Sequence, residues 1–199
     1  MLSGLEILNQ IEKGNIVIEP FNKEQLNPNS YNIRLGNKLL VYKNTLPARR
    51  QKLQDGSYKH IIDSSIRSVG CLDSKKENET IEIIIPEEGY ILEPGILYLG
   101  ETEEYTETIN LVPCIDGRSS IGRLGVQVHA TAGFGDNGFK GKWTLEITTT
   151  HRVRIYPGIQ IGQIYYETLE GDSSMVYNGK YQNQDGVIAS RIQKDYTEK

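Results

Sequence analysis

Thr80-Ile-Glu-Ile-Ile-Ile-Pro-Glu-Glu-Gly-Tyr-Ile-Leu-Glu-Pro-Gly-Ile-Leu-Tyr-Leu99 carries the strongest structural signal in the chain. Its run at 81–85 is rich in isoleucine, and β-branched residues favour strands. A second apolar segment, Tyr90–Leu92, meets a Pro94-Gly95 turn before a third begins at Ile96. Short strands separated by Gly and Pro at this spacing are typical of an all-β barrel or sandwich.

The same pattern of strands and turns extends to both sides of this stretch. Pro157-Gly158 separates strands that we predict at 152–156 and 159–167. Earlier in the chain, strands are predicted at 16–20, 31–35 and 38–42, with Gly36 as the break between the last two. Residues 43–80 are locally basic, and we interpret them as a solvated loop or a long hairpin in preference to a phosphate-contact surface.

The beginning of the chain has the pattern of a short helix at about residues 3–13. Ser3 and Glu6 have the spacing of a capping box, which satisfies free amides at a helix N-terminus. Apolar residues recur at helical spacing as far as Ile11, and Gly14 suits the end of the helix. Little helical periodicity follows, and the polar segment at about 172–199 fits a tail or lid. We therefore expect a single mostly β domain over 1–199 with a few short helices.

Composition narrows the functions open to the chain. Its 199 residues, 37% of them hydrophobic, suffice for one core. A formal net charge of −4 argues against a general DNA or RNA binder, which needs excess positive charge. The start lacks the basic-then-apolar order of a signal peptide, and the longest apolar run, four residues, is too short to span a membrane. We expect a cytoplasmic protein with neither a nucleic-acid nor a membrane partner.

Metal-binding patterns are not evident in the sequence. Cys71 and Cys114 are too few for a disulfide framework or a four-thiolate zinc site, so we expect one buried small apolar residue and one loop thiol. His60, His129 and His151 lack metal-ligand spacing. His129 is either a residue that lines a site or a satisfied core histidine.

Asp116-Gly-Arg-Ser-Ser-Ile-Gly-Arg-Leu-Gly125 concentrates arginines, hydroxyls and glycines in one short stretch. Glycine lets the backbone approach a ligand closely, while hydroxyls, free amides and arginine forks bind phosphate oxygens. The spacing fits equally well a glycine-rich turn in which an arginine pairs with Asp116. It is not a P-loop, because no Gly-Lys-Ser/Thr follows.

Two carboxylates lie in contexts that suit catalysis or binding. Asp136 lies in a glycine-rich loop, where it is either an acceptor for a sugar hydroxyl or a turn residue beside Asn137-Gly138. Glu146 lies in the middle of a strand predicted at 142–148, and strict alternation places it on the face opposite Trp143. If that face lines a cavity, Glu146 has the position of a general base; otherwise it is a solvated outer-face residue.

Taken in order, these motifs resemble the deoxycytidine triphosphate (dCTP) deaminases of the deoxyuridine triphosphatase (dUTPase)-like superfamily. The similarity covers most of the chain and rests on Asn27-Pro-Asn-Ser-Tyr-Asn-Ile-Arg-Leu-Gly36, the stretches 117–125 and 129–136, Thr144-Leu-Glu146, and the stretches 177–184 and 189–192. It implies a distorted β-barrel of the dUTPase-like, β-clip type, assembled as a homotrimer with active sites at subunit interfaces. It also implies that water attacks C4 of the cytosine of dCTP and that ammonia leaves. No zinc is then needed, in contrast to the zinc-dependent deaminases, and Mg²⁺ binds through the triphosphate.

The resemblance implies a role for each matching position. Glu146 would be the general base and acid, while Arg123 and Ser119 would position the water and the exocyclic amine. The substrate would be bound through its phosphates by Arg118, Ser120 and Gly122, through its 3′-hydroxyl by Asp136, through its base by Ala132, Thr144 and Leu145, and under a closing segment by Tyr177, Lys180 and Gln184.

The end point of the reaction stays open in the sequence. Release of dUTP is the main expectation, and hydrolysis of dUTP to dUMP and diphosphate at the same site is the alternative. Ala132-Gly-Phe134 resembles the dUMP-forming type, since the other type tends to carry a His-Arg pair at 133–134, whereas 183–191 resembles the dUTP-releasing type. A dUTP diphosphatase without deamination and a catalytically silent nucleotide-binding regulator are further alternatives. Feedback inhibition by dTTP, known in the family, is an additional hypothesis.

Three positions depart from the usual residues of the family. Asn32 replaces Asp, which weakens any role for that side chain in ordering magnesium or water. Gly135 replaces an apolar residue and Asn137 replaces Pro, beside Asp136. Because Gly and Asn restrict φ less than Pro does, we expect a more mobile loop there or a slightly different substrate, such as a modified deoxycytidine nucleotide.

Overall fold

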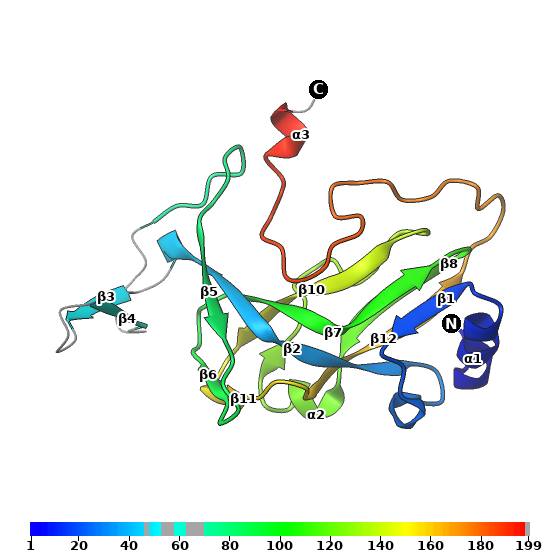
Figure 1. The fold of residues 1–199 in the computed structure, drawn as a ribbon, viewed down its shortest axis with the longest axis horizontal. Coiled ribbons are helices and arrows are strands. Elements are labelled where there is room, and N and C mark those ends of the chain that lie inside the picture. Colours follow the sequence, from blue (N-terminus) through cyan, green and yellow to red (C-terminus); the bar gives the residue numbers. More distant parts are fainter. Residues whose placement is uncertain (46–47, 53–57, 63–69, 198–199) are drawn as a thin grey trace.

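The computed structural model of the chain describes residues 1–45, 48–52, 58–62 and 70–197. Its central feature is an eight-stranded antiparallel sheet in the order β8-β12-β2-β7-β10-β9, with β1 beside β7 and β5 beside β2. The sheet curls into a distorted barrel, and the short helices lie at its periphery (Figure 1). The mostly β fold predicted from the strand-and-turn pattern is therefore confirmed.

The strands of the main sheet are short except for four. They are β1 (Ile16–Glu19), β2 (Tyr31–Tyr42), β5 (Thr80–Ile84), β7 (Tyr98–Thr108), β8 (Leu111–Gly117), β9 (Val126–Gln127), β10 (Lys140–Thr149) and β12 (Gln160–Thr168). The helices are α1 (Gly4–Glu12), α2 (Ser119–Gly122) and α3 (Lys194–Thr197), with 3-10 turns η1 (Lys23–Gln25) and η2 (Lys43–Thr45).

Two small sheets accompany the large one. β6 (Tyr90–Leu92) pairs with β11 (Val153–Ile155), so the two segments next to the Pro-Gly turns come together. β3 (Ala48–Lys52) pairs with β4 (Tyr58–Ile62), which confirms the hairpin interpretation of the basic segment.

The helix predicted from Ser3 begins at Gly4, and half of the predicted capping box forms. Ser3 Oγ accepts a hydrogen bond of 3.2 Å from the backbone N–H of Glu6. The Glu6 carboxylate accepts from the side chains of Asn9 and Gln10 instead of reaching back to Ser3. Amide side chains one turn away thus compete successfully for that carboxylate.

β2 is one continuous strand, where the sequence predicted two strands separated at Gly36. Its register with β7 shifts between Leu35 and Leu39, which surround this glycine. A Cβ atom at position 36 would lie 2.6 Å from Cγ of Glu101 on β7. Gly36 therefore serves a close approach between two strands and does not end one.

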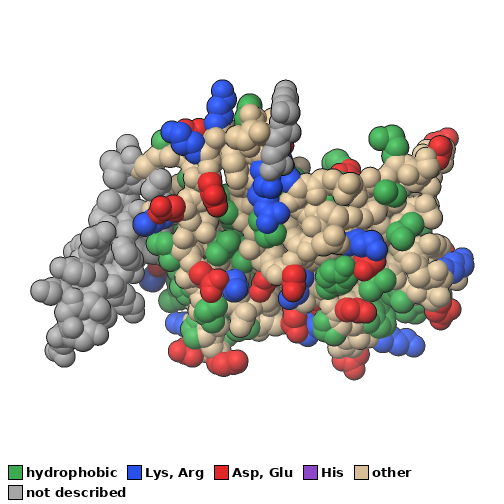
Figure 2. Space-filling view, turned by 45° about the horizontal axis from the view of Figure 1, so that its top comes forward, with side chains coloured by type: hydrophobic (Ala, Val, Ile, Leu, Met, Phe, Trp, Pro, Cys, Tyr) green, Lys and Arg blue, Asp and Glu red, His purple; other side chains and the backbone are tan. Residues whose placement is uncertain are grey.

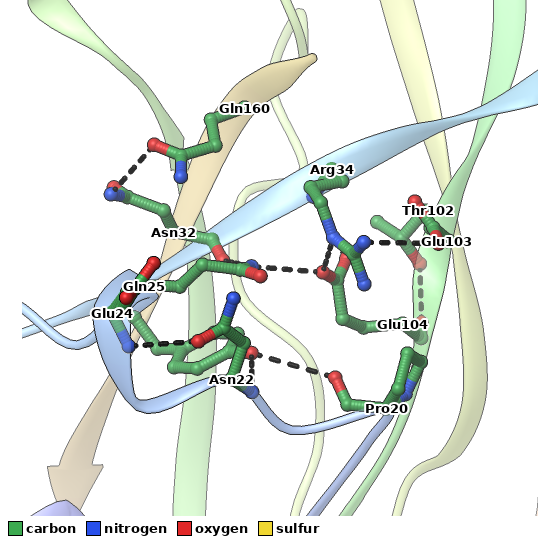
Figure 3. Close-up of polar contacts among 11 residues, drawn as sticks. Pro20, Asn22, Glu24, Gln25, Asn32, Arg34, Thr102, Glu103, Glu104 and Gln160 are labelled. Carbon is green, nitrogen blue, oxygen red and sulfur yellow. Dashed lines mark hydrogen bonds and ion pairs between the residues drawn. The ribbon is translucent and has the colours of Figure 1, made fainter. Parts of the chain in front are cut away.

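A buried ion pair joins β2 to β7 (Figure 3). Glu104 is fully buried; its Oε1 accepts from Arg34 Nε at 2.8 Å and from Gln25 Nε2 at 3.0 Å, and its Oε2 accepts from the backbone N–H of Arg34 at 2.8 Å. Burial disfavours the charge on Arg34, but the hydrogen bond and the charge of Glu104 outweigh it and raise the pKa of the guanidinium. Both charges are thus paired and hydrogen-bonded, as buried charges must be.

Surface features agree with a mildly acidic protein. Acidic and basic side chains are interspersed over the face shown in Figure 2.

Cys114 is buried and Cys71 is exposed, as the sequence predicted. Over the described ranges, none of the helices combines the length and the apolarity that crossing a membrane requires.

Candidate active site

A cavity of about 540 Å³ is lined by residues of β10 and of the C-terminal segment. Figure 1 shows this segment passing over the strands of the barrel. Six of the residues assigned from the sequence line the cavity: Ala132, Asp136, Thr144, Glu146, Tyr177 and Gln184. They come from the glycine-rich loop, from the middle of β10 and from the C-terminal segment, so parts of the chain far apart in sequence meet here.

Glu146 reaches the cavity because its neighbours on β10 are buried on the other side. Leu145 and Ile147 are core residues, and alternation along the strand turns Glu146 away from them. Its Oε2 accepts a hydrogen bond of 2.9 Å from the backbone N–H of Ala130. A backbone amide thereby orients the carboxylate at the cavity wall, which is an arrangement suited to a general base or acid.

Trp143 also lines the cavity, which corrects the strict alternation predicted for this strand. The register of β10 with β7 shifts between Lys142 and Thr144, because β10 advances by two residues while β7 advances by four, from Tyr105 to Glu101. The indole Nε1 donates to Thr106 Oγ1 at 2.9 Å, and the ring packs against Phe139 with centroids 4.8 Å apart. The bulge thus adds an aromatic wall beside Glu146.

Gly135 is the neighbour that this indole requires. A Cβ atom at position 135 would lie 2.4 Å from Cη2 of Trp143 and 3.3 Å from Cγ of Pro113. The space that a side chain would take here is filled by the indole. The departure from the family pattern at 135 therefore has a packing reason.

The C-terminal segment lies across the cavity and is held by hydrogen bonds to side chains of the barrel. The backbone N–H of Ile188 donates to Thr144 Oγ1 at 3.1 Å, and that of Val187 donates to Glu101 Oε2 at 2.9 Å. The backbone N–H of Ser190 donates to the hydroxyl of Tyr42 at 2.9 Å. These bonds bring segment residues against the mouth of the cavity.

Lys180 and Leu145 were assigned to the site, but their side chains point elsewhere. Lys180 Nζ donates to both oxygens of Asp195 at 2.6 Å, and that hydrogen bond raises the pKa of the lysine. The side chain of Leu145 belongs to the core. Only the backbone of Leu145 is left to contact a ligand.

The arginine-serine motif lies apart from the cavity within one chain. α2 begins directly after Arg118, whose Nη1 donates to the backbone oxygen of Gln160 at 3.1 Å. Ser119, Ser120, Gly122 and Arg123 are exposed. In the described parts of the chain, none of these five residues belongs to the lining of the cavity. In Figure 1, α2 and the C-terminal segment lie at opposite ends of the view.

Several lining residues were not assigned to the site from the sequence. They are Tyr42, Leu97, Leu99, Phe134, Phe139, Tyr181, Ile188 and Ser190. Phe134, Tyr181 and Ser190 lie inside stretches that resemble the family, and Phe139 is an aromatic residue inside the glycine-rich stretch, so these four had a signal that could have been used. His129 also lines the cavity and lies 3.4 Å from Asp116 Oδ1, which fits the site-lining alternative for this residue.

The sequence model of the dCTP deaminase-like family matches residues 1–169. The chain belongs to this family.

Curated relatives match this member of the dCTP deaminase-like family over nearly its whole length. A protein of Hathewaya histolytica is 51% identical over 196 residues, which cover 98% of this chain and 99% of that protein. One of Leptospira biflexa is 50% identical over 199 residues, which cover 100% of this chain and 99% of that protein. Both relatives are named "dCTP deaminase, dUMP-forming". Their names agree with the alternative end point rather than with release of dUTP.

A solved structure supports the fold. The crystal structure of 2′-deoxycytidine 5′-triphosphate deaminase from Agrobacterium tumefaciens superposes with a TM-score of 0.57 at 20% sequence identity. The match covers 84% of this chain and 48% of that one, so the chain spans about half the length of the solved protein.

Two of the family departures lie in hydrogen-bond networks. Asn32 is buried, and its Oδ1 accepts from Asn27 Nδ2 at 2.8 Å. Its Nδ2 donates to Gln160 Oε1 at 3.1 Å, as Figure 3 shows. Asn137 is buried and bonded to both the barrel and the C-terminal segment. The Asn137 side chain thus ties the turn after Asp136 to both neighbours. Among the described residues, no group of three or more His, Cys, Asp or Glu is arranged to hold a metal ion.

Proposed function

We propose that the protein is a dUMP-forming dCTP deaminase, which converts dCTP and two water molecules to dUMP, ammonia and diphosphate. One observation carries the deamination step: the Glu146 carboxylate, oriented by the Ala130 amide, lines a cavity together with Asp136 and Thr144. A carboxylate beside a cavity of this kind is what water attack on a pyrimidine requires when no zinc activates the water.

The deamination follows from one group that moves protons. Glu146 takes a proton from the attacking water as the water oxygen bonds to C4 of cytosine. The protonated carboxyl then gives this proton to the ring nitrogen N3. It next takes the remaining proton from the new hydroxyl on C4 and passes it to the exocyclic nitrogen, so that C4 becomes a carbonyl, the C4–N bond breaks, and ammonia leaves. Asp136 accepts a hydrogen bond from the 3′-hydroxyl of the deoxyribose. The base is contacted by Thr144 and by the backbone of Leu145 and Ala132. A second water then cleaves the bond between the α- and β-phosphates, which gives dUMP and diphosphate.

The loop before Asp136 favours the dUMP-forming end point. A Cβ atom at Gly133 would lie 2.9 Å from the backbone oxygen of Ile115 and 3.2 Å from Cε1 of His129. The dUTP-releasing type tends to carry a histidine at position 133. Here a histidine would not fit at this position unless β8 moved. The relatives that match the whole chain carry the dUMP-forming name as well.

The phosphate motif supports sites shared between subunits of a homotrimer. Arg118, Ser119, Ser120, Gly122 and Arg123 would complete the cavity of a second copy, because they are remote from the cavity of their own chain. Arginine forks and serine hydroxyls match phosphate oxygens, and Arg123 with Ser119 would also hold the water and the amine. A cyclic arrangement of three copies would then give three equivalent sites.

Magnesium would enter with the nucleotide. Phosphate oxygens are ligands that Mg²⁺ prefers, and when bound there it neutralises the charge of the triphosphate. The amide group of Asn32 is engaged by Asn27 and Gln160, so we assign it no role in holding the ion.

The test is to incubate the protein with dCTP and magnesium and to separate dCTP, dUTP and dUMP by chromatography. Formation of dUMP with release of ammonia is the expected result. Accumulation of dUTP would show an enzyme that only deaminates, and an absence of conversion would indicate a nucleotide-binding regulator. Addition of dTTP to the same assay tests feedback inhibition.

A further inference from the structure

Asn137 is buried at the turn that follows Asp136, and its side chain joins three separate segments. Its Oδ1 accepts a hydrogen bond of 2.7 Å from the backbone N–H of Asn110, at the turn between β7 and β8. Its Nδ2 donates at 2.9 Å to the backbone oxygens of both Ser173 and Met175 in the C-terminal segment. One oxygen and two N–H groups are thus all engaged.

Two further bonds surround this contact. The backbone oxygen of Asn137 accepts from the N–H of Tyr177 at 2.7 Å. Ser173 Oγ donates to Asn110 Oδ1 at 2.9 Å, so the C-terminal segment is also bonded directly to the turn between β7 and β8. We call Asn110, Asn137 and Ser173 the tail latch. Every bond in it joins two groups of the protein.

The latch lies between two parts of the cavity. Asp136 precedes Asn137 directly, and Tyr177, which follows the latched carbonyls, lines the cavity and packs 6.0 Å from the ring of Phe139. A group that fixes the backbone at 173–177 therefore also fixes where Tyr177 stands relative to Asp136.

We propose that Asn137 is a positioning residue: its side chain docks the C-terminal segment onto the loop of Asp136, so that the nucleotide meets a cavity whose tail side is already in place. The ordering of the segment then costs nothing at the moment of binding, which strengthens binding without changing the chemical step.

Hydrogen exchange tests the latch independently of any activity. In Asn137→Ala the two bonds to the segment are lost, and we expect the amide of Tyr177 to exchange about tenfold faster, while amides of β12 keep their rates. Ser173→Ala removes one exposed bond, and about a twofold increase at Tyr177 is expected. Ser174→Ala is the matched control, because that side chain contacts Asp172 and not the latch.

Unchanged exchange at Tyr177 in Asn137→Ala would overturn the proposal. If Asn137→Ala loosens the whole barrel, so that β12 exchanges faster too, Ser173→Ala decides instead. Faster exchange confined to the segment in that variant supports the latch, and a rate equal to that of Ser174→Ala refutes it.

Kinetics give a second readout, which rests on the proposed function. Asn137→Ala should raise KM for dCTP about tenfold and leave kcat within about twofold, since the contact acts equally on bound substrate and transition state. A fall in kcat with KM unchanged would contradict a positioning role. If the wild-type protein does not convert dCTP, the proposed function fails while the exchange experiment still decides the latch.

Discussion

The hydrogen bond from the Ala130 N–H fixes the position of the Glu146 carboxylate. The ability of this carboxylate to take a proton depends instead on its negative charge. Glu146→Gln separates the two, because an amide oxygen can still accept the Ala130 hydrogen bond but cannot take a proton from water. We expect kcat for ammonia release to fall by about 10²–10⁴-fold while the dissociation constant for dCTP changes less than about threefold.

Binding in that variant can be followed with the intrinsic fluorescence of Trp143, the single tryptophan of the chain. Glu82→Gln is the matched control, since Glu82 is an exposed residue of β5 paired with Lys38. Deamination at the wild-type rate by Glu146→Gln would show that the Glu146 carboxylate does not carry the proton.

The close approach of Gly135 to Trp143 gives a second prediction about a single residue. In Gly135→Ala the new methyl group would lie 2.4 Å from Cη2 of Trp143, so the indole must move. We expect a shift of the tryptophan emission and a rise of about tenfold in KM for dCTP, because the wall of the cavity moves with the ring. Trp143→Phe in the same chain removes the clashing atoms and should restore KM. No rescue would mean that the loop backbone, not the indole, is disturbed.

Among the secondary-structure elements, β2 and β7 are joined by the buried ion pair of Arg34 and Glu104. Glu104→Ala leaves Arg34 with its partner Glu103 alone, at 3.1 Å on the outer side. We expect the free energy of unfolding in urea to fall by about 3–5 kcal/mol, as when one partner of a buried pair is removed. Glu82→Ala, which breaks an exposed pair with Lys38, should cost less than about 1 kcal/mol. Equal losses in the two variants would show that burial of the pair has no consequence.

The strands that could be predicted are those that end at recognisable turn residues. Pro94-Gly95 and Pro157-Gly158 are turns, as expected, and the residues on both sides form strands. Gly36 misled the prediction because a glycine reads the same whether it ends a strand or allows a neighbour to approach. Trp143 was placed on the wrong face because a bulge arises from pairing with β7, and a single strand carries no record of its partner.

The path of the C-terminal segment was equally out of reach. Its backbone bonds to the side chains of Thr144, Glu101 and Tyr42, which belong to three different strands. Such contacts need no periodicity in the segment itself, so its residue pattern does not predict its path. Its polarity indicated a tail or lid, and only the family resemblance placed Tyr177 and Gln184 at the site, where both line the cavity.

For the whole molecule, the main finding is that motifs predicted to form one site divide into two groups. The Glu146 cavity and the arginine-serine motif at α2 lie apart in a single chain. The residues revealed both motifs, but the distance between them depends on the way the barrel closes, which short-range patterns do not encode. The division predicts that a working site needs two chains.

Mixing two inactive variants tests this prediction directly. Glu146→Gln removes the proton-carrying group from one chain, and Arg123→Ala removes the phosphate-motif arginine from another. If α2 of one copy completes the cavity of its neighbour, a random mixed trimer rebuilds an intact site wherever an Arg123→Ala chain supplies Glu146 and a Glu146→Gln chain supplies Arg123. One pairing in four meets this condition, so co-expression should recover about a quarter of the wild-type rate of ammonia release. Chains with two different affinity tags allow the mixed trimer to be isolated, in which one site in three is intact and about a third of the wild-type rate is expected. Each variant expressed alone is the control. A mixed oligomer no more active than its parents would mean that each chain completes its own site.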